Sequence, residues 1–158
     1  MAGITSFGAY IPFYRLAHKE IARAWGGRAG EGERAVANVD EDSVTMAVEA
    51  VRDLLGNSDG REVDGLMFAT TTSPFTEKQA SALIATAADL RNDIRVADYS
   101  GSLRSATTAT LAAIDSVKAG SASNVISHQR TPDSRLRSLP TSASLATPLQ
   151  QSRLATTE

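Results

Sequence analysis

The sequence contains no cysteine, and this absence excludes three kinds of chemistry. A chain without cysteine has no disulfide framework, no thiolate metal ligand and no cysteine nucleophile. Histidine is almost as scarce, because His18 and His128 are the only two and lie too far apart in sequence to suggest a metal cluster. We therefore expect no metal site and no bound cofactor.

Charge of one sign and long apolar runs are also lacking. The chain has 16 basic and 18 acidic side chains, a formal net charge of -2, so no basic field indicates nucleic acid or an anionic membrane as a partner. No stretch approaches the roughly 20 apolar residues that span a bilayer. Residues 1–9 lack the basic region and the long apolar run of a signal peptide. These features predict a soluble cytoplasmic protein.

What is present is enough apolar material for a core: 42% of the 158 residues are hydrophobic, which suits one domain or half of a larger one. The acidic stretch at residues 40–43 offers N-cap residues to a following helix, and Gly56 ends that helix. Strands alternating with helices predict βαβ units around a largely parallel sheet. Strands are expected at residues 4–12, 63–70, 93–98 and from 124, and helices at 16–25, 44–55, 78–90 and 102–119.

Two stretches of the sequence carry polar side chains at predicted strand ends. Thr70 to Phe75 follows an apolar strand, and Asp98 to Ser105 leads from a strand into a helix. Parallel α/β sheets bind ligands at such ends, and a helix start offers free N–H groups to a thiolate or an oxyanion. Serine-rich helix starts are also typical of simple caps, so the pattern alone leaves both interpretations open.

Four stretches with similar order and spacing resemble the N-terminal half of the 3-hydroxy-3-methylglutaryl-CoA synthase family, within the thiolase superfamily. The similarity is greatest to a prokaryotic branch without the active-site cysteine, often encoded beside a zinc-ribbon/OB-fold acyl-CoA-binding protein. The stretches are ITSFGAYIP (4–12), DEDSVTMA (40–47), VDGLMFATTTSPFTEKQ (63–79) and DYSGSLRSATTATLAAIDSVKA (98–119).

The resemblance implies an α/β fold of the thiolase type. Residues 1–126 would form only its N-terminal βαβαβαββ half, so the five-layer αβαβα architecture would be incomplete. In this family a cysteine at a helix N-terminus is acylated by acetyl-CoA, and a glutamate helps the acetyl-enzyme to attack acetoacetyl-CoA. The resemblance further implies an acyl-CoA substrate, a homodimer for the full-length protein and a zinc-ribbon/OB-fold partner.

The family's catalytic residues do not carry over to this chain. Its Cys-x-x-Gly-Thr pattern falls on residues 103–107, which puts Leu103 at the nucleophile position, and a hydrocarbon side chain cannot be acylated. The glutamate position falls on Thr71, which is no general base near neutral pH. We therefore expect a truncated, inactive relative of the acyltransferase. The alternative is a non-catalytic acyl-CoA-binding or scaffold subunit.

Two other side chains near this position are candidates for a role. Ser102 could replace the missing nucleophile if a base lay within hydrogen-bond reach, and otherwise acts as a cap. Arg104 could bind a CoA phosphate, and otherwise is a surface arginine. His18 falls in a predicted early helix with a solvated face, so it is a poor candidate for the base that Ser102 requires.

The composition changes at about residue 127. The last 32 residues include 11 Ser or Thr and three of the five prolines, and no glycine or aromatic residue. Residues 127–158 are therefore expected to form an irregular tail, either disordered or frameshifted. A frameshift near Ile126 is favoured because one shifted reading can restore the family's Ala-Asp-x-Arg and Gly-Asp-x-Ala-Ala segments. The nucleotide sequence at codon 126 tests this hypothesis.

Overall fold

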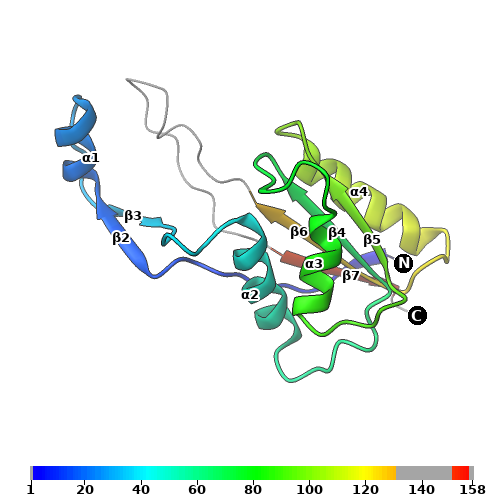
Figure 1. Ribbon diagram of the computed structural model, residues 1–158. Coiled ribbons are helices and arrows are strands. Elements are labelled where there is room, and N and C mark those ends of the chain that lie inside the picture. The colour runs from blue at the N-terminus through cyan, green and yellow to red at the C-terminus, as the bar shows by residue number, and fades with distance from the viewer. Residues whose placement is uncertain (1, 131–150, 157–158) are drawn as a thin grey trace.

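The computed structural model describes residues 2–130 and 151–156, which form a five-stranded sheet with helices on both faces, and a separate hairpin arm (Figure 1). Helix α4 packs on one face of the sheet, and α2 and α3 lie on the other. The strands are β1 (Ala2–Ser6), β2 (Tyr14–Ala17), β3 (Glu33–Val36), β4 (Gly65–Thr70), β5 (Arg95–Tyr99), β6 (Asn124–Arg130) and β7 (Gln151–Thr156). The helices are α1 (His18–Trp25), α2 (Ser43–Leu55), α3 (Ala80–Ala87) and α4 (Ser105–Lys118).

The sheet has the order β1-β7-β6-β4-β5, with β4 parallel to both β5 and β6. Strand β7 is antiparallel to its neighbours β6 and β1. The predicted parallel βαβ arrangement is therefore confirmed for β4, β5 and β6. Strand β4 is apolar up to Ala69 because both of its faces are covered: Leu66 and Phe68 are buried under α2 and α3, while Met67 packs toward α4.

Helix α2 begins where the acidic stretch predicts. The Asp42 carboxylate accepts hydrogen bonds from the backbone N–H groups of Val44 and Thr45, each at 2.8 Å. The Thr45 hydroxyl in turn accepts from the Asp42 N–H at 2.8 Å, which completes a capping box. These bonds satisfy backbone donors that the first turn of a helix cannot pair. They position the start of α2, which lies close to the end of β4.

The segment after β1 lies tightly against α2. A Cβ atom built on Gly8 would lie 2.4 Å from the backbone nitrogen of Leu54 and 2.9 Å from the carbonyl oxygen of Ala50. The next residue, Ala9, donates its N–H to the Asp53 carboxylate at 2.8 Å. Only glycine allows this approach, because the contacting atoms belong to the helix backbone and cannot move aside.

We expect Gly8→Ala to destabilise the chain by about 1–3 kcal/mol, since the added methyl group must push the segment away from α2. Urea unfolding followed by circular dichroism measures this loss. The matched control is Gly3→Ala, because a Cβ at Gly3 would meet nothing within 4 Å. Equal midpoints for the two variants would contradict the tight packing at Gly8.

Helix α4 presents an outer face that is uncharged up to Asp115, where two exposed charged side chains, Asp115 and Lys118, end the helix. The helix has no charged side chain before Asp115, and its inner residues Ala109 and Ala113 are fully buried. Leu111, which points outward, is 55% exposed. The sequence predicts such an apolar face for half of a two-half protein, in which this helix would be covered by the second half.

The arm comprises residues 10–36 and contains β2, α1 and β3. The sequence predicts a helix at residues 16–25, and the structure has α1 there, except that residues 16–17 belong to β2. The sequence does not predict the short strand β3. Strands β2 and β3 pair antiparallel from Tyr14↔Val36 to Ala17↔Glu33. The four-residue β3 follows a glycine-rich stretch, so its apolar pattern is too short to detect.

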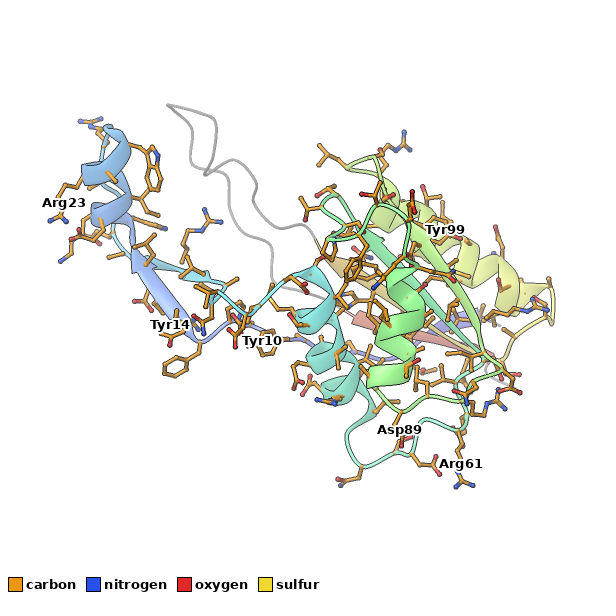
Figure 2. All side chains as sticks on the ribbon, in the orientation of Figure 1. Tyr10, Tyr14, Arg23, Arg61, Asp89 and Tyr99 are labelled. Carbon is orange, nitrogen blue, oxygen red and sulfur yellow. The ribbon has the colours of Figure 1, made fainter. Side chains whose placement is uncertain are left out.

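The arm is anchored where it leaves the body. The Tyr10 hydroxyl, at the base of the arm in Figure 2, donates a hydrogen bond to the Glu41 carboxylate. Glu41 also accepts from the Asn38 N–H at 2.7 Å. The hydrogen bond to Glu41, followed by burial, raises the pKa of Tyr10 to about 12. Both ends of the arm are thus attached to the same carboxylate.

The sheet extends into part of the expected irregular tail. Strand β6 continues to Arg130, so the predicted boundary after residue 126 falls inside a strand, and residues 151–156 form β7. This differs from the expectation because backbone pairing with β4 and β7, and burial of Ser127 and His128, override a composition poor in apolar residues. Residues 131–150 and 157–158 of the expected tail lie outside the described residues.

Candidate functional site

The two polar stretches that the sequence singles out meet at one edge of the sheet. Strands β4 and β5 are parallel, with Ala69 opposite Tyr99, so the turn after Thr70 lies beside the turn after Tyr99. Helix α4 begins at Ser105, directly after the second turn. The predicted arrangement of two strand ends and a helix start is therefore present.

A cavity of about 330 Å³ opens at this edge. Its lining includes Phe68 and Thr70 of β4 and Tyr99 at the end of β5. The lining also includes Phe75 and Lys78, whose ammonium group is 5.3 Å from the centre of the Phe75 ring. The cavity combines apolar surface with hydroxyl groups, the amine of Lys78 and the carboxylates of Glu77 and Asp98. Such a lining suits a small ligand with an apolar part and a polar part.

Asp98 lines the cavity, but its carboxylate is committed to the scaffold. It accepts hydrogen bonds from the N–H groups of Ala80 at 2.6 Å and Ser81 at 2.8 Å, and so caps α3 from a neighbouring strand. Sequence reasoning missed this role. The sequence offers only an indirect signal: glutamine, at position 79 before α3, is not among the residues that favour the N-cap, so the helix start needs another acceptor.

The two histidines lie in different parts of the molecule. His128 is fully buried in β6 and stacks on Phe68, with ring centres 5.6 Å apart and planes 8° apart. His18 is in the arm, where its ring nitrogen Nδ1 lies 3.0 Å from the Glu31 carbonyl oxygen. His18 is therefore held away from the strand ends and cannot be the base for Ser102.

The turn before α4 contains the predicted nucleophile position. The Ser102 hydroxyl accepts a hydrogen bond from the Arg104 N–H at 3.1 Å, and the Ser102 carbonyl oxygen accepts from the Ser105 hydroxyl at 2.7 Å. Ser102 thus shapes the start of the helix. Leu103 is 78% exposed at the tip of this turn, and the adjacent Arg104 is also exposed.

The predicted glutamate position lies in the turn after β4. Thr71 is half-buried there, between two threonines that fix the turn. The Thr70 hydroxyl accepts from the Thr72 N–H at 3.2 Å, and the Thr72 carbonyl oxygen accepts from the Ser43 hydroxyl at 3.1 Å. This turn supplies hydroxyl groups and no carboxylate, so it can bind a ligand but cannot remove a proton from carbon.

In the part of the chain that the structure describes, no three potential metal ligands gather into a cluster. Within the same residues, no helix is long and apolar enough to cross a bilayer.

A second hollow, of about 320 Å³, lies at the opposite edge of the sheet and is lined by Asp64, Arg91 and Arg95 among others.

The Asp64 carboxylate at this opposite edge joins the sheet to the turn after α4. It accepts from the N–H groups of Ser123 at 2.7 Å and Asn124 at 3.1 Å, and from Arg91 at 3.3 Å. Partial burial alone would raise its pKa, but these bonds and the Arg91 charge outweigh burial, and the pKa of Asp64 is lowered. The bonds therefore favour the ionised form.

We expect this carboxylate to contribute stability that depends on pH. A lowered pKa in the folded state means that the contribution is present above the ordinary aspartate value of about 3.9 and is lost as pH falls through the lowered value. The loss should be at most about 1 kcal/mol because the side chain is one-third exposed. As pH falls, the free energy of unfolding should therefore decrease more for the natural chain than for Asp64→Asn. Asp59→Asn, which changes a more exposed carboxylate, should lose stability with falling pH to the same extent as the natural chain.

Comparison with solved structures gives the fold class. β-Ketoacyl-[acyl carrier protein] synthase III from Thermus thermophilus superposes with a TM-score of 0.77 and 22% identity, over 97% of this chain and 50% of that one. A hydroxymethylglutaryl-CoA synthase complexed with CoA superposes with a TM-score of 0.81 and 18% identity, over 98% of this chain and 42% of that one. The fold is therefore thiolase-like.

Comparison with curated sequences narrows the class to a family. The hydroxymethylglutaryl-CoA synthase of Pyrococcus horikoshii is 35% identical over 123 residues, 76% of this chain and 35% of that protein. That of Methanocella arvoryzae is 30% identical over 132 residues, 78% of this chain and 38% of that protein. No protein-family model matches the chain. By sequence and fold the chain is a relative of the hydroxymethylglutaryl-CoA synthase family, and it spans little more than a third of the curated relatives' length.

Proposed function

We propose that this chain is the N-terminal half of a hydroxymethylglutaryl-CoA synthase-like protein that binds an acyl-CoA but cannot form an acyl-enzyme. The observation that carries the proposal is Leu103, which occupies the exposed turn at the start of α4 where the family pattern requires a cysteine. In this proposal the strand-end cavity receives the acyl group, while Leu103 and Thr71 stand at the positions of the family's nucleophile and general base.

The residues present support binding rather than bond formation. A leucine side chain has no lone pair with which to attack a thioester carbonyl, and Thr71 offers only a neutral hydroxyl group. The exposed Arg104 lies beside the helix start and can meet an anionic phosphate. The apolar cavity floor at Phe68 and the hydroxyl of Thr70 can accommodate a short acyl group. We therefore expect reversible association and no turnover.

The second candidate is a non-catalytic scaffold subunit, assembled with a zinc-ribbon/OB-fold protein. The stretch of α4 before Asp115 favours it, since a partner that covers this stretch would bury no charged side chain. In this case the whole protein belongs to a branch of the family that has lost the cysteine. We also expect the full-length protein to be a homodimer and to act in the cytoplasm.

Incubation with acetyl-CoA labelled in the acetyl group tests the proposal. We expect no covalent label on the chain, together with reversible binding of CoA in equilibrium dialysis. Arg104→Ala should weaken binding by about three- to tenfold if that guanidinium meets a phosphate. Arg61→Ala is the matched control, because Arg61 is exposed on a distant loop (Figure 2).

Two results would contradict the proposal. A stable acetyl label would show that another nucleophile acts, and loss of that label in Ser102→Ala would identify the serine. Absence of CoA binding in every form, together with tight binding of a zinc-ribbon/OB-fold protein, would favour the scaffold role.

A further inference from the structure

The sequence contains two Asp-Gly pairs, at residues 59–60 and 64–65, and no Asn-Gly pair. An Asp-Gly bond is chemically labile, because glycine has no side chain to keep its backbone nitrogen away from the carboxyl carbon of the preceding aspartate. Attack by that nitrogen closes a five-membered succinimide ring. The two pairs belong to one chain, so the effect of their different structural surroundings can be compared directly.

The first pair lies in the loop between α2 and β4, from which Arg61 extends in Figure 2. The Asp59 side chain is 65% exposed there. Its carboxylate accepts a hydrogen bond from the Arg61 N–H at 3.1 Å and pairs with the Arg61 Nε at 2.9 Å. A carboxylate that bonds the N–H group two residues on forms an Asx turn, and so lies beside the peptide group between them. That peptide group carries the Gly60 nitrogen, which is the nucleophile for ring closure.

The Gly60 nitrogen lies outside the helices and the sheet. Its N–H donates to the Ser58 hydroxyl at 3.3 Å, a long hydrogen bond within the same loop. The hydroxyl oxygen thus accepts the hydrogen that the nitrogen must lose when it attacks. No helix or strand has to open before the Asp59 carboxyl and this nitrogen can react.

The second pair is held by the fold. Gly65 is buried at the start of β4, which pairs with β5 on one side and β6 on the other. The Asp64 carboxylate accepts hydrogen bonds from Ser123, Asn124 and Arg91. These bonds outweigh burial and lower the pKa of Asp64, so the protonated carboxyl group, which loses water more easily than the carboxylate, is scarce. Reaction at this pair would require both the strand and the carboxylate to detach.

We propose that Asp59 is a site of spontaneous isomerisation to isoaspartate in the folded chain, and that the fold protects Asp64 from the same reaction. The Gly60 nitrogen bonds to the side-chain carboxyl carbon of Asp59, the C–O bond of that carboxyl group breaks, and its hydroxyl group leaves as water with the proton of the nitrogen. Water then adds to one of the two carbonyl groups of the succinimide. Addition at the main-chain carbonyl leaves residue 59 joined to Gly60 through its side chain, with a free α-carboxylate.

The modified bond lengthens the main chain by one carbon atom where the loop packs closely. A Cβ atom built on Gly60 would lie 2.7 Å from the Leu90 side chain and 3.5 Å from that of Leu55. Leu90 is buried in the core, so isomerisation should loosen the contact of the loop with the core. The new α-carboxylate is a group that a carboxyl methyltransferase using S-adenosylmethionine could methylate. This modification is independent of the proposed acyl-CoA function, because no residue of the loop lines the strand-end cavity.

Incubation of the folded chain at neutral pH, followed by trypsin digestion and mass spectrometry, tests the proposal. Cleavage after Arg52, Arg61 and Lys78 places Asp59 and Asp64 in different peptides. The succinimide appears as the loss of one water, and isoaspartate as a peptide of unchanged mass that incorporates labelled methyl groups from an isoaspartate methyltransferase. We expect Asp59 to react at least about tenfold faster than Asp64, since a local opening that costs about 1.4 kcal/mol slows a reaction tenfold.

Two controls separate the effect of the fold from that of the local sequence. In guanidinium chloride the two sites should react at similar rates, because the unfolded chain protects neither. Asp59→Glu should give no product at position 59, since the corresponding six-membered ring closes far more slowly, and should leave the circular dichroism spectrum unchanged. Equal rates at the two sites of the folded chain, a faster reaction at Asp64, or no reaction at Asp59 under conditions in which the unfolded chain reacts would overturn the proposal. A preference for Asp59 that persists in guanidinium chloride would also overturn it, because the local sequence would then be the cause.

Discussion

Leu103→Cys should convert an inert chain into one with a reactive thiol. The thiol would stand at the N-terminus of α4, next to Arg104, where the helix dipole and the guanidinium both favour a thiolate. Cysteines in such places have pKa values of about 3.5–7.5, against an ordinary value of about 8.5. At slightly acid pH we therefore expect alkylation by iodoacetamide to be about tenfold faster than for an ordinary exposed cysteine.

Leu111→Cys is the matched control for this experiment. Leu111 is also exposed, but it lies about two turns into the same helix, where the dipole no longer acts. The two thiols should differ in pKa by one unit or more, as measured from the pH dependence of alkylation. Acetyl-CoA should label the Leu103→Cys chain and leave the Leu111→Cys chain unlabelled. Identical pKa values at the two positions would show that the start of α4 does not activate a thiol at residue 103. That result would contradict the assignment of Leu103 to the acylation position.

Phe68→Ala should cause the largest loss of stability of any single change considered. Phe68 is 1% exposed in the interior strand β4, stacks on the His128 ring and lies within the core that α2 and α3 cover. Removing its ring leaves a cavity, so we expect a loss of about 3–5 kcal/mol in the free energy of unfolding. In a chain of this size that loss lowers Tm by about 10 °C.

The control for Phe68→Ala is the same substitution at Phe7, which is 73% exposed. Phe7→Ala should change the free energy of unfolding by less than about 0.5 kcal/mol. Thermal unfolding followed by circular dichroism measures both variants. If the free energy of unfolding of Phe68→Ala lay within about 1 kcal/mol of that of the natural chain, β4 would not be packed as the structure describes.

Much of the fold could be predicted because local signals agree with long-range packing. The start of α2 follows from Asp42 and its neighbours, and β4 follows from a continuous apolar run. The meeting of the Thr70 and Tyr99 turns follows from parallel pairing alone. In each case the residue types that favour the element are also the ones that its surroundings require.

Other features could not be predicted, since they depend on partners distant in sequence. The cap that Asp98 places on α3 joins residues 17 and 18 positions apart, and no local pattern encodes it. The burial of His128 depends on its register opposite Phe68. The hairpin arm was missed because β3 has four residues and follows a glycine-rich stretch. Sequence reasoning thus located the edge of the sheet that forms the site, and left out the bonds that fix it.

The carboxylate of Asp98 couples the local unfolding of strand β5 to that of the first turn of helix α3. Strand β5 is an edge strand of the sheet, so it is free to fray from its outer side. When its end detaches, the amide protons of Ala80 and Ser81 lose their acceptor, and the first turn of α3 becomes open to exchange with solvent. The helix start and the strand end therefore behave as one cooperative unit, and a molecule that orders the Tyr99 turn would slow deuterium uptake at α3 as well.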